Sequence, residues 1–339
     1  MTVGIAAAWD QISADRRAEP GWHARRIHAF SATPIHAALR QPGAAKALLL
    51  EVQARSIHPA NTFPSSSGFN VTLESLVPGP NGTVRVCLEL TDNRYADVFA
   101  VLTDDVASSV AAASTEQAGI AALIGRLNTW QRFLKRHGDH SLSDQERVGL
   151  FAELLVLRDL MAKGLAASDA VDAWRGPWGG AQDFSLTTCA VEVKATASIH
   201  PVRFEVSNLA QLDDRSLPAL ILRHVALTRT PGSGETLPNL VDTLRHIIER
   251  TDSAAVQRFS DSLLEVGYLD AQRSEYDGEG YAVHAERSFE VRGDFPRILS
   301  SDVRPGIGAC SYSVELAACL PFLIDEAQAD RAIHGGPYE

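Results

Sequence analysis

The spacing of apolar residues in the first third of the chain predicts strands. Before about residue 110 these residues come in short β-rich runs, separated by turn-forming stretches such as Pro78–Gly82 and Thr91–Tyr95. Residues 1–30 show no clear pattern. An antiparallel N-terminal sheet is therefore expected, and the runs that would supply its strands are 45–54, 69–77, 83–90 and 97–106.

The spacing then becomes helical. A helix is predicted over 113–136, and a second one begins at Ser143-Asp144-Gln145-Glu146, where Ser143 and Glu146 can form a capping box. The second helix is expected to end near Lys163, with Gly164 as its stop.

A loop rich in small residues and tryptophan (166–182) precedes the next predicted elements. The continuous apolar run 217–227 is typical of a strand buried on both faces. The full order of the predicted elements is three strands (183–188, 190–196 and 202–208), a short helix (208–214), the buried strand (217–227), two amphipathic helices (238–250 and 253–266) and a β-rich tail (281–291 and 311–320).

This order predicts a mixed α/β protein with three segments. Residues 1–110 form a β-rich region, residues 111–230 form a core with leading helices, and residues 231–339 form a C-terminal α/β extension. No run of 18 or more apolar residues and no signal-peptide pattern is present, so a cytoplasmic protein without a membrane span is expected.

Charge and cysteine content narrow the class of function. The formal net charge of −11 argues against binding polyanions regardless of their sequence, although basic stretches at 25–30 and 130–138 could line a local groove. The four cysteines are scattered, which argues against zinc and against a disulfide framework. Only four of the 31 basic residues are lysines, so a lysine carries more information here than usual.

One of these lysines lies in the predicted strand 190–196. Side chains alternate along a strand, so Glu192, Lys194 and Thr196 share one face. A Glu-x-Lys pair alone is typical of an exposed strand face. If a two-residue turn at 188–189 joins this strand to the preceding one, Asp183 pairs with Lys194 and points to the same face.

The predicted helix 143–163 adds a further carboxylate. Glu153 lies between Leu150 and Leu157, on or beside the stripe expected to pack on the sheet. A carboxylate there is costly unless it is paired, hydrogen-bonded or bound to a metal. Alternatively, Glu153 lies at the margin of the stripe and reaches solvent, or pairs with Arg158.

Together these features resemble the PD-(D/E)XK nuclease superfamily. The resemblance rests on Asp183 followed by Glu192-Val193-Lys194, within an α-β-β-β-α-β order. The stretches 149–160, 183–196 and 295–316 resemble a bacterial family known as PD-(D/E)XK motif proteins, which is related to restriction-type enzymes. The proline expected before the first acid is absent, since Gln182 precedes Asp183.

The resemblance implies a restriction-endonuclease-like core that hydrolyses DNA with Mg²⁺, or with Mn²⁺. It implies that Asp183, Glu192, the Val193 carbonyl and Glu153 hold the metal, an ion that prefers oxygen ligands. Lys194 would orient or deprotonate the attacking water, or neutralise charge on the phosphate. Lysine can lose its proton when its environment lowers its pKa, whereas arginine effectively cannot. Thr196, Ser207 and Gln211 would contact the substrate or position the strand.

The implied setting is bacterial restriction or anti-phage defence, with DNA as the partner and an ATPase or other defence subunits as further partners. Two other hypotheses fit the same residues. The chain could be a non-catalytic DNA- or protein-binding subunit of a larger complex, or an unrelated α/β protein in which Glu-x-Lys is a coincidence. RNA is an alternative substrate.

Overall fold

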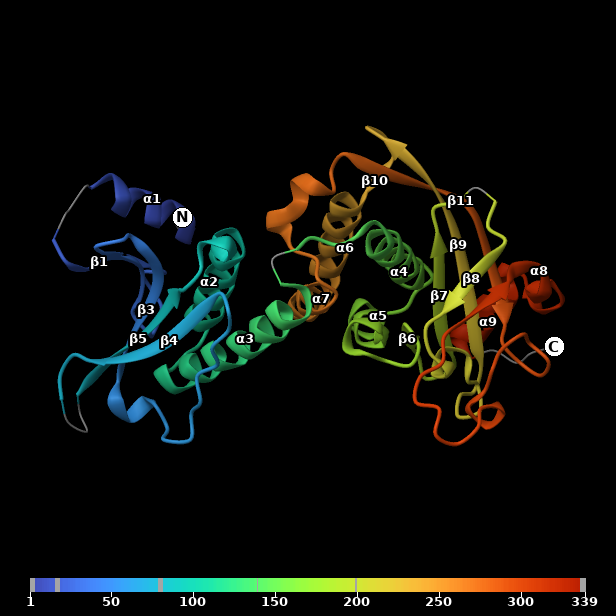
Figure 1. The fold of residues 1–339 in the computed structure, drawn as a ribbon, viewed down its shortest axis with the longest axis horizontal. Helices are drawn as coiled ribbons and strands as arrows, with labels where there is room; N and C mark the ends of the chain where they lie inside the picture. The colour runs from blue at the N-terminus through green and yellow to red at the C-terminus, as the bar shows by residue number, and fades with distance from the viewer. Residues whose placement is uncertain (1–3, 16–18, 79–81, 139, 199, 336–339) are drawn as a thin grey trace. The chain divides into compact units, whose positions relative to one another are not determined.

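The computed structural model describes residues 4–15, 19–78, 82–138, 140–198 and 200–335. The chain divides into two compact units, Met1–His140 and Ser141–Glu339, and each has its own sheet (Figure 1). The division falls at residue 140, so the helix expected at 113–136 belongs with the N-terminal strands.

The first unit contains a five-stranded antiparallel sheet. Its strands run in the order β1-β2-β3-β5-β4. Strands β3, β4 and β5 confirm three of the predicted runs. Strand β1 comes from residues 1–30, which show no clear pattern, and β2 was not predicted. The bounds are β1 Gly21–Ile27, β2 Ile35–Gln41, β3 Ala45–Gln53, β4 Phe69–Ser75 and β5 Thr83–Leu90.

Three helices accompany this sheet: α1 (Ile5–Ala14), α2 (Ala96–Ala111) and α3 (Glu116–His137). The prediction of a strand at 97–106 is wrong, because this segment lies within α2. Its apolar residues recur every three or four positions, and Phe99, Leu102, Val106 and Val110 are all buried on one face of the helix. Helix α3 confirms the predicted helix.

The second unit is built on a sheet with the strand order β10-β11-β9-β7-β6. Strands β7 and β9 are parallel, and the other neighbours are antiparallel, with β13 added to β11. The bounds are β6 Phe184–Ser185, β7 Ala190–Thr196, β9 Leu220–Pro231, β10 Glu235–Thr236, β11 Glu279–Glu290 and β13 Leu323–Ile324.

Helices cover one face of this sheet. Val191 and Val193 of β7 and Val225 of β9 pack into one apolar core with α4 (Asp144–Ala162), α6 (Leu237–Thr251) and α7 (Ser253–Glu265). The other face packs on a two-stranded sheet of β8 (Arg203–Val206) and β12 (Tyr312–Glu315), where Leu222 meets Phe204. Residues that alternate along β9 thus enter different cores, as the pleat of a strand requires.

Several sequence-based boundaries in this unit need correction. The loop predicted at 166–182 contains a helix, α5 (Ala167–Ala173), and the first of the three predicted strands shrinks to the two residues of β6. In the predicted strand at 311–320, β12 is followed by helix α8 (Leu316–Cys319), and helix α9 (Glu326–His334) lies beyond it. Strand β9 is less apolar than expected, since Arg223 and His224 are buried within it.

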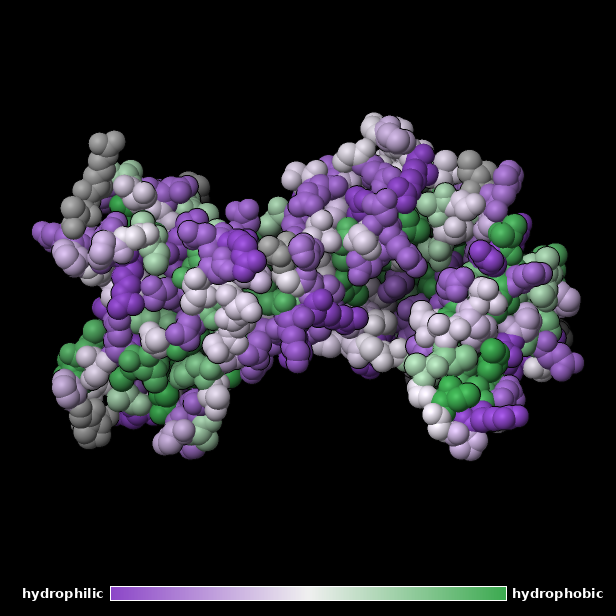
Figure 2. All heavy atoms as spheres, viewed as in Figure 1, coloured by the Kyte–Doolittle hydropathy of each residue, from purple (hydrophilic) through white to green (hydrophobic). Residues whose placement is uncertain are grey.

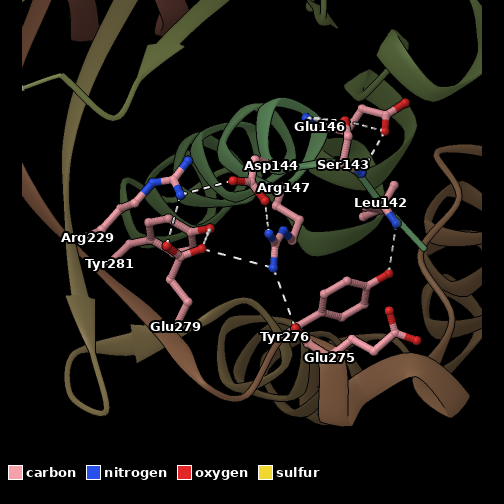
Figure 3. A network of polar contacts seen from close by, with 10 residues as sticks. All are labelled: Leu142, Ser143, Asp144, Glu146, Arg147, Arg229, Glu275, Tyr276, Glu279 and Tyr281. Atoms are coloured by element: carbon pink, nitrogen blue, oxygen red, sulfur yellow. Dashed lines mark hydrogen bonds and ion pairs between the residues drawn. The ribbon is translucent and has the colours of Figure 1, made fainter.

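A polar network fixes the beginning of α4 (Figure 3). The capping box is present: Ser143 accepts from the backbone N–H of Glu146, whose carboxylate accepts from that of Ser143. The hydroxyl of Tyr276 accepts from the Leu142 backbone N–H across 3.0 Å. Arg229 of β9 lies 3.1 Å from Asp144 and from Glu279 of β11. The first turn of α4 is thereby tied to both strands, which orients the rest of the helix.

The surface view in Figure 2 is mostly polar, with smaller apolar areas on each unit. Among the helices of the described ranges, none combines the length and the hydrophobicity that a membrane crossing would need.

Candidate active site

The hairpin of β6 and β7 brings the first acid beside the Glu-x-Lys strand. The pairs Phe184–Val191 and Ser185–Ala190 place Asp183 opposite Glu192, so the expected pairing of Asp183 with Lys194 is wrong by two residues. The turn has four residues instead of two, and the Leu186 N–H donates to the Cys189 carbonyl across 2.9 Å. Because a shift of two residues preserves the face, Asp183 still lies on the side of Glu192 and Lys194.

Glu192 is the most enclosed member of the group, with a relative exposure of 1%. Its Oε1 lies 2.9 Å from Nζ of Lys194, but the contact lacks hydrogen-bond geometry, and neither carboxylate oxygen has a hydrogen-bond partner in the described part of the chain. Burial, followed by the charge of Asp183, raises the pKa of Glu192 to about 8, although Lys194 opposes this shift. A buried carboxylate without a hydrogen bond is a costly arrangement.

The pKa values of Asp183 and Glu153 are also raised by burial. The Asp183 carboxylate accepts from the Val193 backbone N–H across 2.7 Å, yet burial raises its pKa to about 6. Burial and the nearby charge of Asp183 raise the pKa of Glu153 well above its ordinary value. Burial therefore makes all three carboxylates easier to protonate than exposed ones, and a bound cation would favour their ionised forms.

Lys194 is held from two sides. Its Nζ lies next to Glu192 and donates to Oε1 of Gln211 across 3.0 Å. The same oxygen of Gln211 accepts from the Ser207 backbone N–H across 2.8 Å. Gln211 and Ser207, expected as substrate contacts, thus lie within the support of Lys194, and Ser207 takes part through its backbone.

Thr196 lies where β7 begins to open to solvent. Its hydroxyl accepts from the Ser198 backbone N–H across 3.1 Å, and the exposure of β7 rises from buried Glu192 to half-buried Lys194 and Thr196. The site therefore becomes accessible at the C-terminal end of this strand.

Glu153 points into the site from α4. The indole N–H of Trp174 donates to its Oε2 across 2.7 Å. The alternative pairing with Arg158 does not occur, because Arg158 lies 2.8 Å from Glu235.

The loop after Trp174 closes around the two acids. Backbone N–H groups of Arg175 and Gly176 donate to the Asp183 carbonyl across 2.7 and 3.0 Å. A Cβ on Gly176 would lie 3.0 Å from Asp183 Oδ1 and 3.1 Å from Glu153 Oε2, so glycine leaves room for both carboxylates. The sequence did not single out Gly176, and Trp174 appeared only as part of a loop rich in small residues and tryptophan. The Gly- and Trp-rich composition of 174–180 was the available signal.

The carboxylate oxygens of Asp183, Glu192 and Glu153 suit a cation that prefers oxygen ligands. These side chains do not by themselves form a complete set of metal ligands. Within the described ranges, no three or more His, Cys, Asp or Glu side chains are grouped as metal ligands. Asp183 and Glu192 would therefore need backbone or water oxygens to complete a shell, which is usual for Mg²⁺.

Comparison with known proteins gives one family match. Residues 5–317 match the model of one protein family, described as "Putative PD-(D/E)XK family member, (DUF4420)". No curated protein and no solved structure matches the chain. The family match spans both units and includes every residue of the candidate site, from Glu153 to Gln211. The chain therefore belongs to this PD-(D/E)XK-type family.

Proposed function

We propose that the protein is a metal-dependent nuclease that hydrolyses phosphodiester bonds in DNA, with a restriction-endonuclease-like core formed by α4, β6, β7, β8, the turn 209–212 and β9. The observation that carries this proposal is the fully buried Glu192. It lies 2.9 Å from Lys194, and neither of its carboxylate oxygens has a hydrogen-bond partner among the residues that the structure describes. A carboxylate in this state is suited to bind a cation.

The donor set favours Mg²⁺ or Mn²⁺. Asp183 and Glu192 would hold the ion, with the Val193 carbonyl and Glu153 as further oxygen donors, and only oxygen atoms are involved. A bound divalent cation would polarise the scissile phosphate and lower the pKa of an attacking water.

The protein's own groups would perform the remaining steps. Lys194 lies where it can orient a water and accept its proton, or neutralise charge that develops on the phosphate. Gln211 holds the Lys194 ammonium in place, and Trp174 does the same for the Glu153 carboxylate. The half-buried end of β7 would admit the backbone of the substrate.

Bacterial restriction or anti-phage defence is the proposed setting, since the family resembles restriction-type enzymes. The net charge of −11 favours delivery of DNA by a partner, such as an ATPase or another defence subunit.

The proposal is tested by incubating the purified chain with supercoiled DNA and Mg²⁺ or Mn²⁺. Wild type should nick or cut the DNA, and Lys194→Ala should reduce the rate by roughly 10²- to 10⁴-fold, the usual contribution of a positioned acid–base group. Lys135→Ala is the matched control, because Lys135 is an exposed lysine of the first unit.

Calorimetric titration with Mn²⁺ provides the second measurement. Wild type should bind the ion, whereas Asp183→Asn and Glu192→Gln should bind it at least tenfold more weakly. Equal binding by wild type and Asp183→Asn, or full cleavage by Lys194→Ala, would contradict the nuclease assignment. The first outcome would instead favour a non-catalytic binding subunit.

A further inference from the structure

A cavity of about 280 Å³ lies on the second unit, lined by three histidines, one arginine and small or apolar residues. The polar lining residues are His200, His224, His284 and Arg287, and none of the described residues that line the cavity carries a carboxylate. This composition is unusual in a chain with 42 acidic and 31 basic residues. The cavity therefore favours an anion over a cation.

The cavity continues the row of residues that contains Lys194. In the parallel pair of β7 and β9, Lys194 lies opposite His224, and in the antiparallel pair of β9 and β11, His224 lies opposite Arg287. Directly opposite residues point to the same face of a sheet. Neighbouring strands lie about 4.8 Å apart, so the backbones at Lys194 and Arg287 are separated by roughly 10 Å.

A β-bulge adds His284 to this row. Val283 pairs with Leu227 and Ala285 pairs with Ala226, which leaves His284 as the extra residue of β11. A bulge of this kind redirects a side chain and is frequent beside functional sites.

The imidazole of His224 has a ring nitrogen that could bind a ligand in the cavity. His224 has a relative exposure of 2%, and its Nε2 has no hydrogen-bond partner in the described ranges. Burial, followed by the charge of Arg287, lowers the pKa of His224 to about 4, so its imidazole is neutral at ordinary pH and keeps one N–H donor. Arg223, whose side chain points to the other face, pairs with Asp159 and Glu286 instead.

We infer that this cavity, the His224–Arg287 site, binds a phosphate group, and that its source is a backbone phosphate of the nucleic acid strand whose scissile phosphate lies at Lys194. The exposed guanidinium of Arg287 can bind phosphate oxygens in a bidentate manner, and the imidazole of His224 can donate a further hydrogen bond. Because this site lies roughly 10 Å along the sheet from Lys194, a second phosphate held there would fix the direction of the strand. The choice of a nucleic acid strand over free phosphate rests on the proposed function.

The experiment measures binding of short labelled DNA to the full chain in EDTA, where no cleavage occurs. Fluorescence anisotropy over a range of salt concentrations gives the number of phosphate contacts as the slope of log K against log[salt]. Arg287→Ala should weaken binding and reduce the slope by about 0.7 to 0.9, the value of one phosphate contact. Arg287→Lys should restore part of the slope.

Arg250→Ala is the matched control. Arg250 is an exposed arginine of α6, and this helix packs on the opposite face of the sheet, so its removal changes the net charge equally without touching the cavity. The slope of Arg250→Ala should remain that of wild type. Circular dichroism checks that each variant is folded.

A second arm uses inorganic phosphate and observes the imidazole NMR signal of His224. Wild type should show a shift that Arg287→Ala lacks. An unchanged salt slope together with this shift would overturn the nucleic acid source and leave a site for free phosphate. No shift and no change in slope would overturn the site itself. If inorganic phosphate shifts the His224 signal but the chain neither binds nor cuts DNA, the proposed nuclease function would be refuted. The phosphate site would then remain supported.

Discussion

The indole nitrogen of Trp174 lies 2.7 Å from Oε2 of Glu153 and donates a hydrogen bond to it. This contact connects the loop before β6 with α4, whose beginning is fixed by the network around Arg229 and Tyr276. Asp183 is tied to the same loop through its carbonyl. The positions of two acids from different elements therefore depend on a single loop.

Removing the indole donor should destabilise the protein in a pH-dependent way. In Trp174→Phe, Glu153 loses the hydrogen bond that the indole N–H donates to its carboxylate. Leaving a buried carboxylate without this donor should lower the free energy of unfolding by about 1–3 kcal/mol. The loss of unfolding free energy should be larger at pH 8 than at pH 5, because the indole N–H stabilises the ionised form of Glu153 and the fraction of that form rises with pH. Chemical denaturation at the two pH values measures this difference. Trp178→Phe is the control, because the indole of Trp178 donates to a neutral hydroxyl, that of Ser262. An equal effect of both variants would contradict the role of Trp174.

Gly176→Ala should weaken metal binding without unfolding the chain. The added methyl group would lie 3.0 Å from Asp183 Oδ1 and 3.1 Å from Glu153 Oε2, so both carboxylates must move by a few tenths of an ångström. Mn²⁺ titration should report a several-fold weaker affinity. The control is Gly149→Ala in α4, where the added methyl group has open space and should stabilise the helix by about 0.5–1 kcal/mol. Unchanged Mn²⁺ affinity in Gly176→Ala would show that the contact is not restrictive.

The metal-free protein should lose stability as the pH rises from about 4.5 to about 8. Glu192 has a pKa of about 8 in the folded chain and an ordinary value of 4.5, so the folded state retains a proton that the unfolded state has released. The free energy of unfolding should therefore fall by up to ~1.4 kcal/mol for each pH unit within that window. Thermal unfolding in EDTA across this range should show the decline, and Glu192→Gln should flatten it. Mn²⁺ should stabilise wild type most at high pH, where no proton competes. A decline of equal slope in Glu192→Gln would assign it to other groups.

Gln211→Leu should impair Lys194 without removing it. The side-chain oxygen of Gln211 accepts from Lys194 and from the Ser207 backbone, so the variant leaves the ammonium free to turn away. We expect a roughly tenfold lower cleavage rate with a changed pH–rate profile, and Gln211→Glu should restore the rate in part. If Gln211→Leu changes only the substrate affinity and leaves the pH profile intact, the residue contacts substrate instead.

The shared face of Asp183, Glu192 and Lys194 could be predicted from the sequence because its strongest signals are local. The capping box at Ser143 and the alternation of Glu192 and Lys194 in β7 depend on neighbours in the chain, and both are present. The register of Asp183 depends on turn length, and the four-residue turn could not be distinguished from a two-residue turn by composition. The predicted face of Asp183 is nevertheless correct, because the register was wrong by two residues. An error of one residue would have turned Asp183 to the opposite face.

Features that depend on tertiary packing were not predicted. The segment of α2 was assigned to a strand, because apolar residues such as Val98 and Phe99 suit either element until their burial is known. The hydrogen bond from Trp174 to Glu153 spans 21 residues. The row of Lys194, His224 and Arg287 exists only once three strands have paired, so nothing in their sequence spacing indicates it.

The parallel pairing of β7 with β9 has a consequence for the order of events during synthesis. The candidate site residues from Glu153 to Gln211 leave the ribosome before Leu220–Pro231, the strand that pairs with β7. Until β9 is synthesised, these carboxylates are hydrated and ionise at ordinary pH, and Lys194 is a solvated cation. A nascent chain would thus carry every residue of the candidate site without its buried environment, and the site would form only when a later part of the chain completes the sheet.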